Sequence, residues 1–218
     1  RTPLTTIKSY AETLLLGAIE DSDLATRFLK VIDSESDRMT RLVKDLLMLS
    51  RIDYEKEQWE MKEMDISKVV NDCIYKMEIA AKQKHQSISL EILGDIPNII
   101  GDKDRIEQVI INIISNSIKY TSEKGNIYVK LFKDDEYINI RIKDNGIGIP
   151  KEDAVRLFER FYRVDKARSR VLGGTGLGLS IARQIVEAHK GSINLESVYG
   201  EGTEVIIKLP INLDVNLS

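Results

Sequence analysis

Cysteine and proline are scarce in this chain, and long apolar runs are missing. The single Cys73 excludes a disulfide framework and a cysteine metal site, and it lies in a helical pattern that favours a core position. No apolar run has the length of a membrane-spanning helix, and no secretory signal is found. Because the chain opens at Arg1 without an initiating Met, we expect it to be a piece of a longer protein.

Positive charge is not in excess either. Lys and Arg number 32 against 35 Asp and Glu, a net charge of -3, which argues against nucleic acid as the main partner. The 218 residues suit one large or two small domains. A hydrophobic share of 42% with 31% charged residues is typical of a globular protein, and neither a disordered nor a membrane protein has this balance.

Glycine is concentrated in two clusters, 144–150 and 173–179. The first follows an alternating run, 137–143, that predicts a strand and places Asp144 in line with its apolar residues, Ile138, Ile140 and Ile142. A carboxylate on a buried face needs a hydrogen-bond donor, which could be protein backbone or the exocyclic amine of a bound purine. The glycines after Asp144 favour the purine, because they let a flat ligand approach the backbone.

The second glycine cluster runs into a helical pattern, 180–189. Free N–H groups and the positive dipole end at a helix start can hold a phosphate. The order Gly-x-x-Gly-x-Gly without a preceding strand does not match the dinucleotide-binding fingerprint, and no P-loop motif exists in the chain. Two glycine turns beside a buried Asp therefore predict a nucleotide pocket of another type.

Two helices are expected at the start of the chain, at 1–18 and from a cap at Ser22 or Asp23 to about residue 57. The second helix has nearly a heptad seam, formed by Leu24, Phe28, Val31, Glu35, Met39, Leu42, Leu46 and Leu49. Pairing of two such hairpins into a four-helix bundle, and so a homodimer, would bury the seams. The alternative is that the hairpin packs on the rest of its own chain.

The remainder mixes helices and strands. Composition changes near 60–65, which we interpret as a linker or short strand, so the expected domains are a hairpin at 1–59 and a second domain at 66–218. Helices are expected at 66–84, 102–119 and 180–189, and strands at 87–93, 126–133, 136–143, 192–197 and 203–209. This pattern predicts an α+β fold with one layer of helices on a mostly antiparallel sheet.

A polar stripe flanks the core face of the helix expected at 102–119. Its members fall within an arc of about 80°, and they are Arg105, Gln108, Asn112, Asn116 and Lys119. A polar stripe is usually a solvated face, but Asn is a poor helix former, so two of them four residues apart leave a ligand and solvent as open alternatives. An Asn oxygen suits Mg²⁺ bound to phosphates, Lys119 can reach a phosphate, and Tyr120 can stack on a base or cover it.

Together these residues resemble the ATP-binding domain of sensor histidine kinases in bacterial two-component systems, within the gyrase–Hsp90–kinase–MutL ATPase superfamily. The resemblance is carried by five motifs, which are similar to the N box (112–120), the first G box (144–148), the F box (158–163), the second G box (174–178) and the last glycine motif (200–203). It implies an α/β-sandwich of the Bergerat type for 66–218, preceded by the dimerising hairpin.

The resemblance implies ATP and Mg²⁺ as cofactors. It implies that Asn116 binds Mg²⁺, that Lys119 and Arg163 meet phosphates, that Tyr120 flanks the nucleotide, and that Asp144 takes the adenine amine. Thr203 is a weaker candidate nearby, and 166–172 would be a lid over the triphosphate. The glycine turns would supply further contacts through Gly146, Gly148, Ile149, Gly174, Thr175, Gly176, Leu177, Gly178 and Leu179.

Asn112 discriminates between reactions. Hydrolytic members of the superfamily carry a Glu one helical turn before the metal-binding Asn, and this chain has Asn112 there. Without a carboxylate to activate water, transfer to a positioned acceptor is favoured over hydrolysis. Asn112 thus opposes the first alternative function, an ATP-driven conformational clamp. The completeness of the motifs opposes the second, a non-catalytic dimer that senses nucleotide.

The start of the chain, from Arg1 to Leu4, resembles the end of the H box. The resemblance places the phosphoacceptor His and its neighbouring Glu just before Arg1, whereas His85 and His189 do not match the motif. We expect both to be structural, with a helix C-terminus near His189 favouring positive charge.

Thr2 matches the position that orients water when the family dephosphorylates its partner, although an ordinary first-turn Thr is the alternative. Four residues on one helical face match positions that contact the response regulator, namely Thr6, Ser9, Tyr10 and Thr13.

We therefore expect the cytoplasmic core of an inner-membrane sensor histidine kinase, with no direct membrane contact in this part. It would autophosphorylate a His and pass the phosphoryl group to a response regulator receiver domain.

Overall fold

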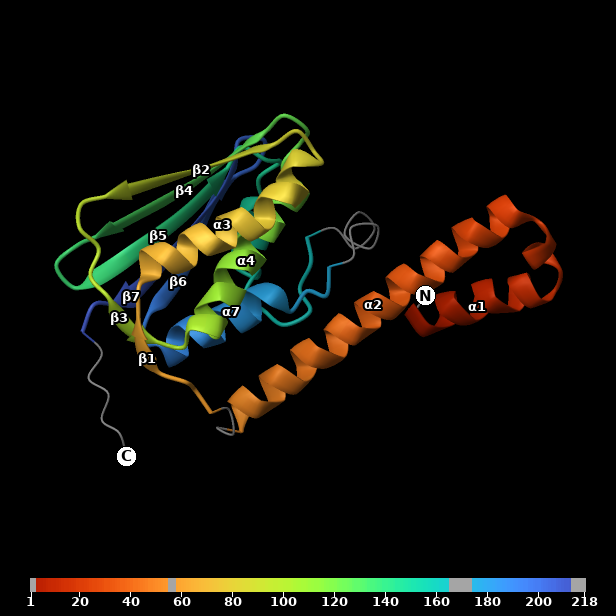
Figure 1. Ribbon diagram of the computed structural model, residues 1–218, viewed down its shortest axis with the longest axis horizontal. Helices are drawn as coiled ribbons and strands as arrows, with labels where there is room; N and C mark the ends of the chain where they lie inside the picture. The colour runs from red at the N-terminus through yellow and green to blue at the C-terminus, as the bar shows by residue number, and fades with distance from the viewer. Residues whose placement is uncertain (1–2, 55–57, 165–173, 213–218) are drawn as a thin grey trace.

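An antiparallel helical hairpin extends from a layered α/β part of the molecule (Figure 1). The computed structural model describes residues 3–54, 58–164 and 174–212. The hairpin consists of α1 (Pro3–Leu15), a short 3-10 helix η1 (Ala18–Glu20) and α2 (Ser22–Asp53). The rings of Tyr10 and Phe28 hold its two helices together, with their centroids 4.8 Å apart.

The N-cap of α2 is Asp21, so the prediction of Ser22 or Asp23 was wrong. The Asp21 carboxylate accepts hydrogen bonds from the N–H groups of Asp23 and Leu24, at 3.1 and 3.0 Å. The Asp21 backbone is extended, as is usual for an N-cap residue, and Gly17, at φ 117°, precedes η1 in the left-handed region. The other end of α2 is at Asp53, four residues before the expected limit.

The layered part is built on a five-stranded sheet of order β2-β4-β5-β7-β6. The strands are β2 (Ser87–Leu93), β4 (Asn126–Lys133), β5 (Tyr137–Asp144), β6 (Ser192–Val198) and β7 (Gly202–Pro210). Only the pairing of β2 with β4 is parallel, and the other three pairings are antiparallel. The expected mostly antiparallel sheet is confirmed.

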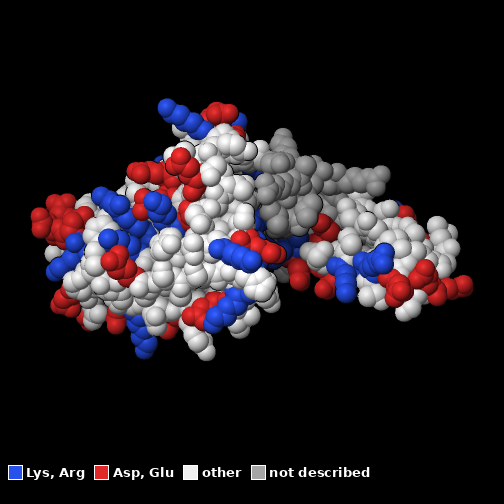
Figure 2. Space-filling model, turned by 90° about the horizontal axis from the view of Figure 1, so that it is seen from above, with Lys and Arg blue, Asp and Glu red and all other residues white. Residues whose placement is uncertain are grey.

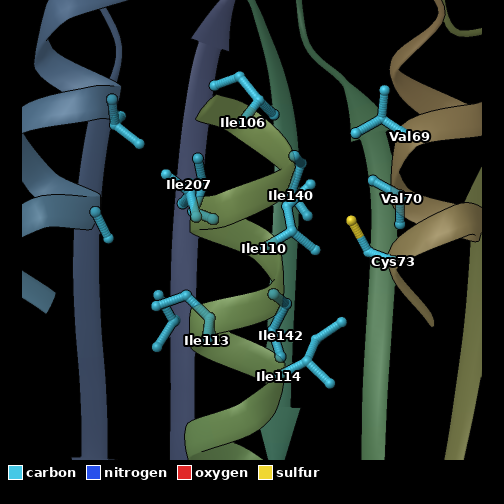
Figure 3. Packing of buried hydrophobic residues seen from close by; sticks show 14 of the residues in the cluster. Val69, Val70, Cys73, Ile106, Ile110, Ile113, Ile114, Ile140, Ile142 and Ile207 are labelled. Carbon is cyan, nitrogen blue, oxygen red and sulfur yellow. The ribbon is translucent and has the colours of Figure 1, made fainter. Parts of the chain in front are cut away.

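Helices α3 (Ile66–Lys82), α4 (Lys103–Tyr120) and α7 (Gly178–Ala188) cover one face of this sheet, as Figure 1 shows, and α5 (Lys151–Ala154) is a single turn. Isoleucines of α4 fill the layer between helices and strands (Figure 3). Burying each such side chain contributes roughly 1.5–3 kcal/mol. Cys73 of α3 joins this core, and burial raises its pKa to about 12, so its thiol stays protonated and inert.

The segment interpreted as a linker or short strand contains a strand. β1 (Lys62–Met64) pairs antiparallel with β3 (Ile99–Gly101), which makes a two-stranded sheet beside the five-stranded one. Asp65 follows β1 and caps α3, and Asp102 follows β3 and caps α4. The chain that leads from the hairpin thus enters the layered part through β1, which pairs with β3 of that part.

The predicted seam of α2 divides into two parts. Of its members, Leu49 is buried in the core of the layered part and Leu42 packs against it; Met48 and Ile52, which were not part of the predicted seam, lie there too. This half follows the alternative in which the hairpin packs on its own chain. By contrast, Leu46 remains 45% exposed.

Candidate nucleotide site

Asp144 ends strand β5 on the buried face of the sheet, and its side chain is held on both oxygens. It is 6% exposed. Its Oδ2 accepts a hydrogen bond from the hydroxyl of Ser117 at 2.9 Å, and its Oδ1 accepts one from the N–H of Gly146 at 3.0 Å. Ser117 was not predicted as a site residue, although it is a serine among the isoleucines of the α4 core face.

The Asp144 carboxyl is held in an environment that disfavours its charge. Burial raises its pKa, against the opposing effect of hydrogen bonds from Gly146, Ser117 and the backbone of Thr203. An ionised carboxylate offers about four lone-pair sites, so three donors leave capacity for one more. A neutral N–H donor is well suited to that place, because it satisfies the carboxylate without a further buried charge.

Packing explains the glycines that follow Asp144. A Cβ at Gly146 would lie 2.7 Å from the carbonyl oxygen of Tyr120, and one at Gly148, where φ is +63°, would lie 2.0 Å from that of Val198. The turn is pressed between the end of α4 and the end of β6. In addition, the N–H of Ile149 donates to the hydroxyl of Ser197 at 2.9 Å. Room for a flat ligand, the reason given in the sequence analysis, is therefore not required to account for these glycines.

The polar stripe of α4 faces the second glycine turn. A Cβ at Gly178, the first residue of α7, would lie 2.4 Å from Oδ1 of Asn112, and one at Gly174 would lie 2.9 Å from Nζ of Lys119. Nδ2 of Asn112 is buried and has no hydrogen-bond partner among the described residues. Asn116 lies on the same stripe and is half-buried. The start of α7 therefore approaches the predicted metal and phosphate side chains.

Lys119 lies where several cations converge. Burial lowers its pKa to about 8, and the positive charges of Arg163, Arg41, Arg38 and Lys84 add to the effect. Its Nζ also lies 5.1 Å from the centre of the Tyr120 ring. A half-buried ammonium group surrounded by guanidinium groups is a favourable site for a multiply charged anion.

Other predicted contacts of the second glycine turn serve the fold. Leu177 is fully buried in the core, and Leu179 packs against it. Gly176, at φ +77°, accepts a hydrogen bond at 2.8 Å from the N–H of Phe161 in the F box. Thr175 points to the hairpin, where its hydroxyl donates to Asp45 at 3.0 Å.

A contact surface between α2 and the layered part was not foreseen. Asp53 accepts two hydrogen bonds from the guanidinium group of Arg160, at 2.6 and 2.7 Å, and one from Gln184 at 3.2 Å. Nearby, a cavity of about 400 Å³ is lined by residues of the 156–163 segment, including Arg160. Contacts between segments so far apart in the chain leave no periodic signal in the sequence.

The predicted regulator-binding residues divide between two environments. Ser9 and Thr13 are exposed, and the hydroxyl of Thr13 donates to the Ser9 carbonyl at 2.8 Å. Thr6 is half-buried, and Tyr10 packs on α2 through Phe28. Two further predictions, Thr2 and the 166–172 lid, lie outside the described residues.

His189 has the expected structural role, but for another reason. It is 1% exposed, its Nε2 accepts the N–H of Asp102 at 2.9 Å, and its Nδ1 lies 2.7 Å from the Ile185 carbonyl oxygen. Burial lowers its pKa, so the ring is neutral with the proton on Nδ1. The expected positive charge at the helix end was wrong.

Comparisons with known proteins agree with this architecture. The family of histidine kinase-, DNA gyrase B-, and HSP90-like ATPases matches residues 101–213, and the His Kinase A (phospho-acceptor) domain matches residues 1–55. The sensor histidine kinase WalK of Bacillus subtilis is 44% identical over 96% of the chain. The sensor protein kinase WalK of Staphylococcus aureus has the same identity and coverage. The chain spans 34% and 51% of the length of these two relatives.

Solved structures show the same fold. The histidine kinase AdeS of Acinetobacter baumannii superposes with a TM-score of 0.77 at 26% identity, over 98% of this chain and 97% of that one. The histidine kinase ThkA in complex with the response regulator protein TrrA gives 0.79 at 24% identity, over 97% and 58%.

A helical hairpin joined to an ATP-binding sandwich of this kind defines a histidine kinase core. The chain belongs to the family of histidine kinase-, DNA gyrase B- and HSP90-like ATPases, among its sensor histidine kinases. Within the described residues, no helix combines the length and apolar character that a membrane span requires.

Proposed function

We propose that this chain is the catalytic core that uses ATP and Mg²⁺ to phosphorylate a histidine next to its hairpin, and that a response regulator receiver domain then takes the phosphoryl group onto an Asp. The observation that carries the proposal is the buried Asp144 carboxylate with one acceptor site left, beside an α4 stripe that faces the start of α7.

Each ligand group has a counterpart among the described residues. Asp144 accepts the adenine amine, Tyr120 flanks the base, and Lys119 and Arg163 bind phosphates. Asn116 offers an amide oxygen to Mg²⁺, whose other ligands would be phosphate oxygens and water. No group of three His, Cys, Asp or Glu side chains forms a metal cluster in the described parts of the chain. Bound ATP·Mg²⁺ supplies the γ-phosphoryl group with part of its charge neutralised.

Asn112 favours transfer over hydrolysis. Its amide stands one turn before Asn116 on the stripe and cannot accept a proton from water as a Glu would. The chain instead binds, orients and neutralises charge, and the acceptor histidine provides the nucleophile. A clamp-type ATPase would need a general base at this position.

Partner binding follows from exposed surfaces of the hairpin. Apolar side chains that are 53–88% exposed lie along it and would be covered in a homodimeric four-helix bundle, namely Leu15, Leu16, Leu29, Val43 and Leu47. The exposed Ser9 and Thr13 would face the receiver domain, as part of a surface with Thr6 and Tyr10. The similarity to ThkA, whose structure contains the response regulator protein TrrA, supports a response regulator as the partner.

The remaining parts of the proposal concern the whole protein. Thr2 would orient water for dephosphorylation of the regulator. The units would be the hairpin at 1–59, the linker at 60–65 and the ATP-binding domain at 66–218, forming the cytoplasmic part of an inner-membrane sensor.

Labelling with γ-phosphate-labelled ATP tests the proposal. The protein used should extend at its N-terminus through the H box, and Mg²⁺ should be present. Protein-bound label that is acid-labile and base-stable is expected, because phosphohistidine has this stability. Release of free phosphate without protein label would instead indicate the clamp-type ATPase and would refute the kinase assignment.

A further inference from the structure

One face of α2 lies along the ATP-binding domain. Met48 contacts Arg105 and Gln108 at the start of α4 through its Sδ, at 3.8 and 3.4 Å, and Asp45 accepts the hydroxyl of Thr175 at the second glycine turn. These two α2 residues are spaced three apart, so they share a helical face. Steps of four and three residues continue this face toward the N-terminus of α2 through Arg41 and Arg38, which therefore lie on the same side as the contacts with the domain.

Arg38 is desolvated and only partly paired. Its side chain is 14% exposed, and one Nη donates to Glu35 one turn before it, at 3.2 Å. Its Nε is buried and has no hydrogen-bond partner among the described residues. A buried guanidinium nitrogen without an acceptor costs free energy that an incoming acceptor would recover. Arg41 is exposed and adds a second guanidinium group one turn away.

The face of α2 that carries these arginines is turned toward the phosphate side of the predicted pocket. Gly174, next to Thr175, lies against Nζ of Lys119, so the contact of Asp45 with Thr175 brings α2 close to that ammonium. Consistent with this, the charges of Arg163, Arg41 and Arg38 add to the effect of burial in lowering the pKa of Lys119. Figure 2 shows Lys and Arg side chains, with Asp and Glu beside them, where the hairpin meets the ATP-binding domain.

Cations that face each other across an interface repel, and an anion placed between them reverses the sign. The two acidic neighbours, Glu35 and Asp45, are engaged with Arg38 and Thr175.

The hairpin register adds a second argument. With Tyr10 packed on Phe28, the antiparallel helices bring Pro3 about opposite Glu35, one turn from Arg38. The start of α1, beside which the proposed acceptor would lie, is therefore close to the two arginines.

We infer that Arg38 and Arg41 bind the terminal phosphate of ATP together with Lys119 and Arg163, so that the hairpin contributes part of the nucleotide site. This inference rests on the proposed function, because it requires ATP in the pocket next to Asp144. The two domains then form one phosphate site, with the terminal phosphate held toward the acceptor by guanidinium groups from the hairpin.

Binding of ATP and of ADP to this chain, each with Mg²⁺ and followed by calorimetry, tests the inference. Arg38→Gln and Arg41→Gln should each weaken ATP binding about tenfold, the loss expected for one charged hydrogen bond, and leave ADP binding unchanged. Arg38→Lys should restore part of the ATP preference. The matched control is Arg27→Gln, an exposed arginine on the same helix, which should change neither affinity.

Other outcomes count against the inference. An unchanged ratio of ATP to ADP affinity in the double variant Arg38→Gln/Arg41→Gln would overturn it. So would an equal loss for both nucleotides, which would place the arginines away from the terminal phosphate. Failure of the unsubstituted chain to bind either nucleotide would overturn the proposed function itself, and this inference with it. Circular dichroism of each variant shows that the helices are intact.

Discussion

Asp53, the last residue of α2, and Arg160, in the F box, form a forked ion pair in which both carboxylate oxygens accept from the guanidinium group. Hydrogen bonds from Arg160 hold the pKa of Asp53 below its usual value. Because this pKa is lowered, the ion pair contributes to stability at neutral pH, and this contribution is lost as the pH falls through the folded-state pKa of Asp53. At physiological pH the ion pair therefore joins the end of α2 to the ATP-binding domain.

Breaking this pair should loosen the docking of the two parts. We expect Asp53→Asn and Arg160→Gln each to increase the radius of gyration in small-angle scattering, and the double variant to add little, because both remove the same interaction. Glu159→Gln is the control, since it breaks the neighbouring exposed pair with Arg156 and leaves α2 untouched. Additive effects of the two single substitutions would show that the residues act independently.

Asp144→Asn should abolish nucleotide binding without unfolding the protein. The amide keeps the shape of the side chain but loses the negative acceptor and adds an N–H, so a loss of roughly a hundredfold or more is expected. Because burial already raises the pKa of Asp144, a neutral side chain costs the fold little, and the melting temperature should be retained. ATP titration checks the first point, with the exposed Asp135→Asn as control. Retained affinity in Asp144→Asn would remove the adenine assignment.

Lys119 predicts two pH dependences of opposite sign. Its pKa is about 8 in the folded protein against an ordinary 10.5. Between these values the unfolded chain binds a proton that the folded one lacks, so this residue makes stability rise with pH. ATP binding should weaken over the same range, because the ammonium group proposed to bind phosphate loses its charge.

The measurement for Lys119 is a difference between the parent chain and Lys119→Met. Melting temperatures and ATP affinities at pH 7 and pH 9.5 give the pH dependence of stability and of ATP binding. The Lys119→Met variant should lack the part of each dependence that comes from Lys119. Parallel curves for the two proteins at every pH would contradict the assigned titration of Lys119.

The exposed apolar residues of α2 predict where a dimer forms. Leu47 and Val43 are 56% and 53% exposed, and Leu47→Glu should shift the chain to a monomer in sedimentation velocity. The control is Lys44→Glu, which also introduces a Glu at an exposed position of α2 and should leave the dimer intact. An unsubstituted chain that is monomeric at high concentration would refute the proposed bundle.

Local patterns in the sequence were sufficient for the elements and for part of the site. Alternation in β5 placed Asp144 on the buried face, and the 3.6-residue period of α4 placed Asn112 and Lys119 on one stripe. Such patterns follow from the geometry of one strand or helix, and so they can be found without knowing what packs on them. Why Gly148 has to be a glycine could not be predicted, because the carbonyl oxygen that a side chain there would meet belongs to Val198 at the end of another strand, β6.

Contacts between distant segments were missed for the same reason. Asp53 and Arg160 are 107 positions apart, and nothing near either residue marks its partner. Ser117 was overlooked because a small polar residue on a core face is consistent with ordinary packing. The division of the α2 seam also depended on the docking of two domains, which periodicity within one helix does not describe.

The parallel pairing of β2 with β4 has a consequence for how this protein reaches its native state. Parallel neighbours need a crossover, and here the chain from β2 to β4 passes through α4. The pairing of β2 with β4 therefore closes a loop that contains all of α4, and such non-local pairing slows folding. Since α4 also carries Asn112, Asn116 and Lys119, the crossover that joins these two strands is the segment that holds the proposed nucleotide-binding side chains.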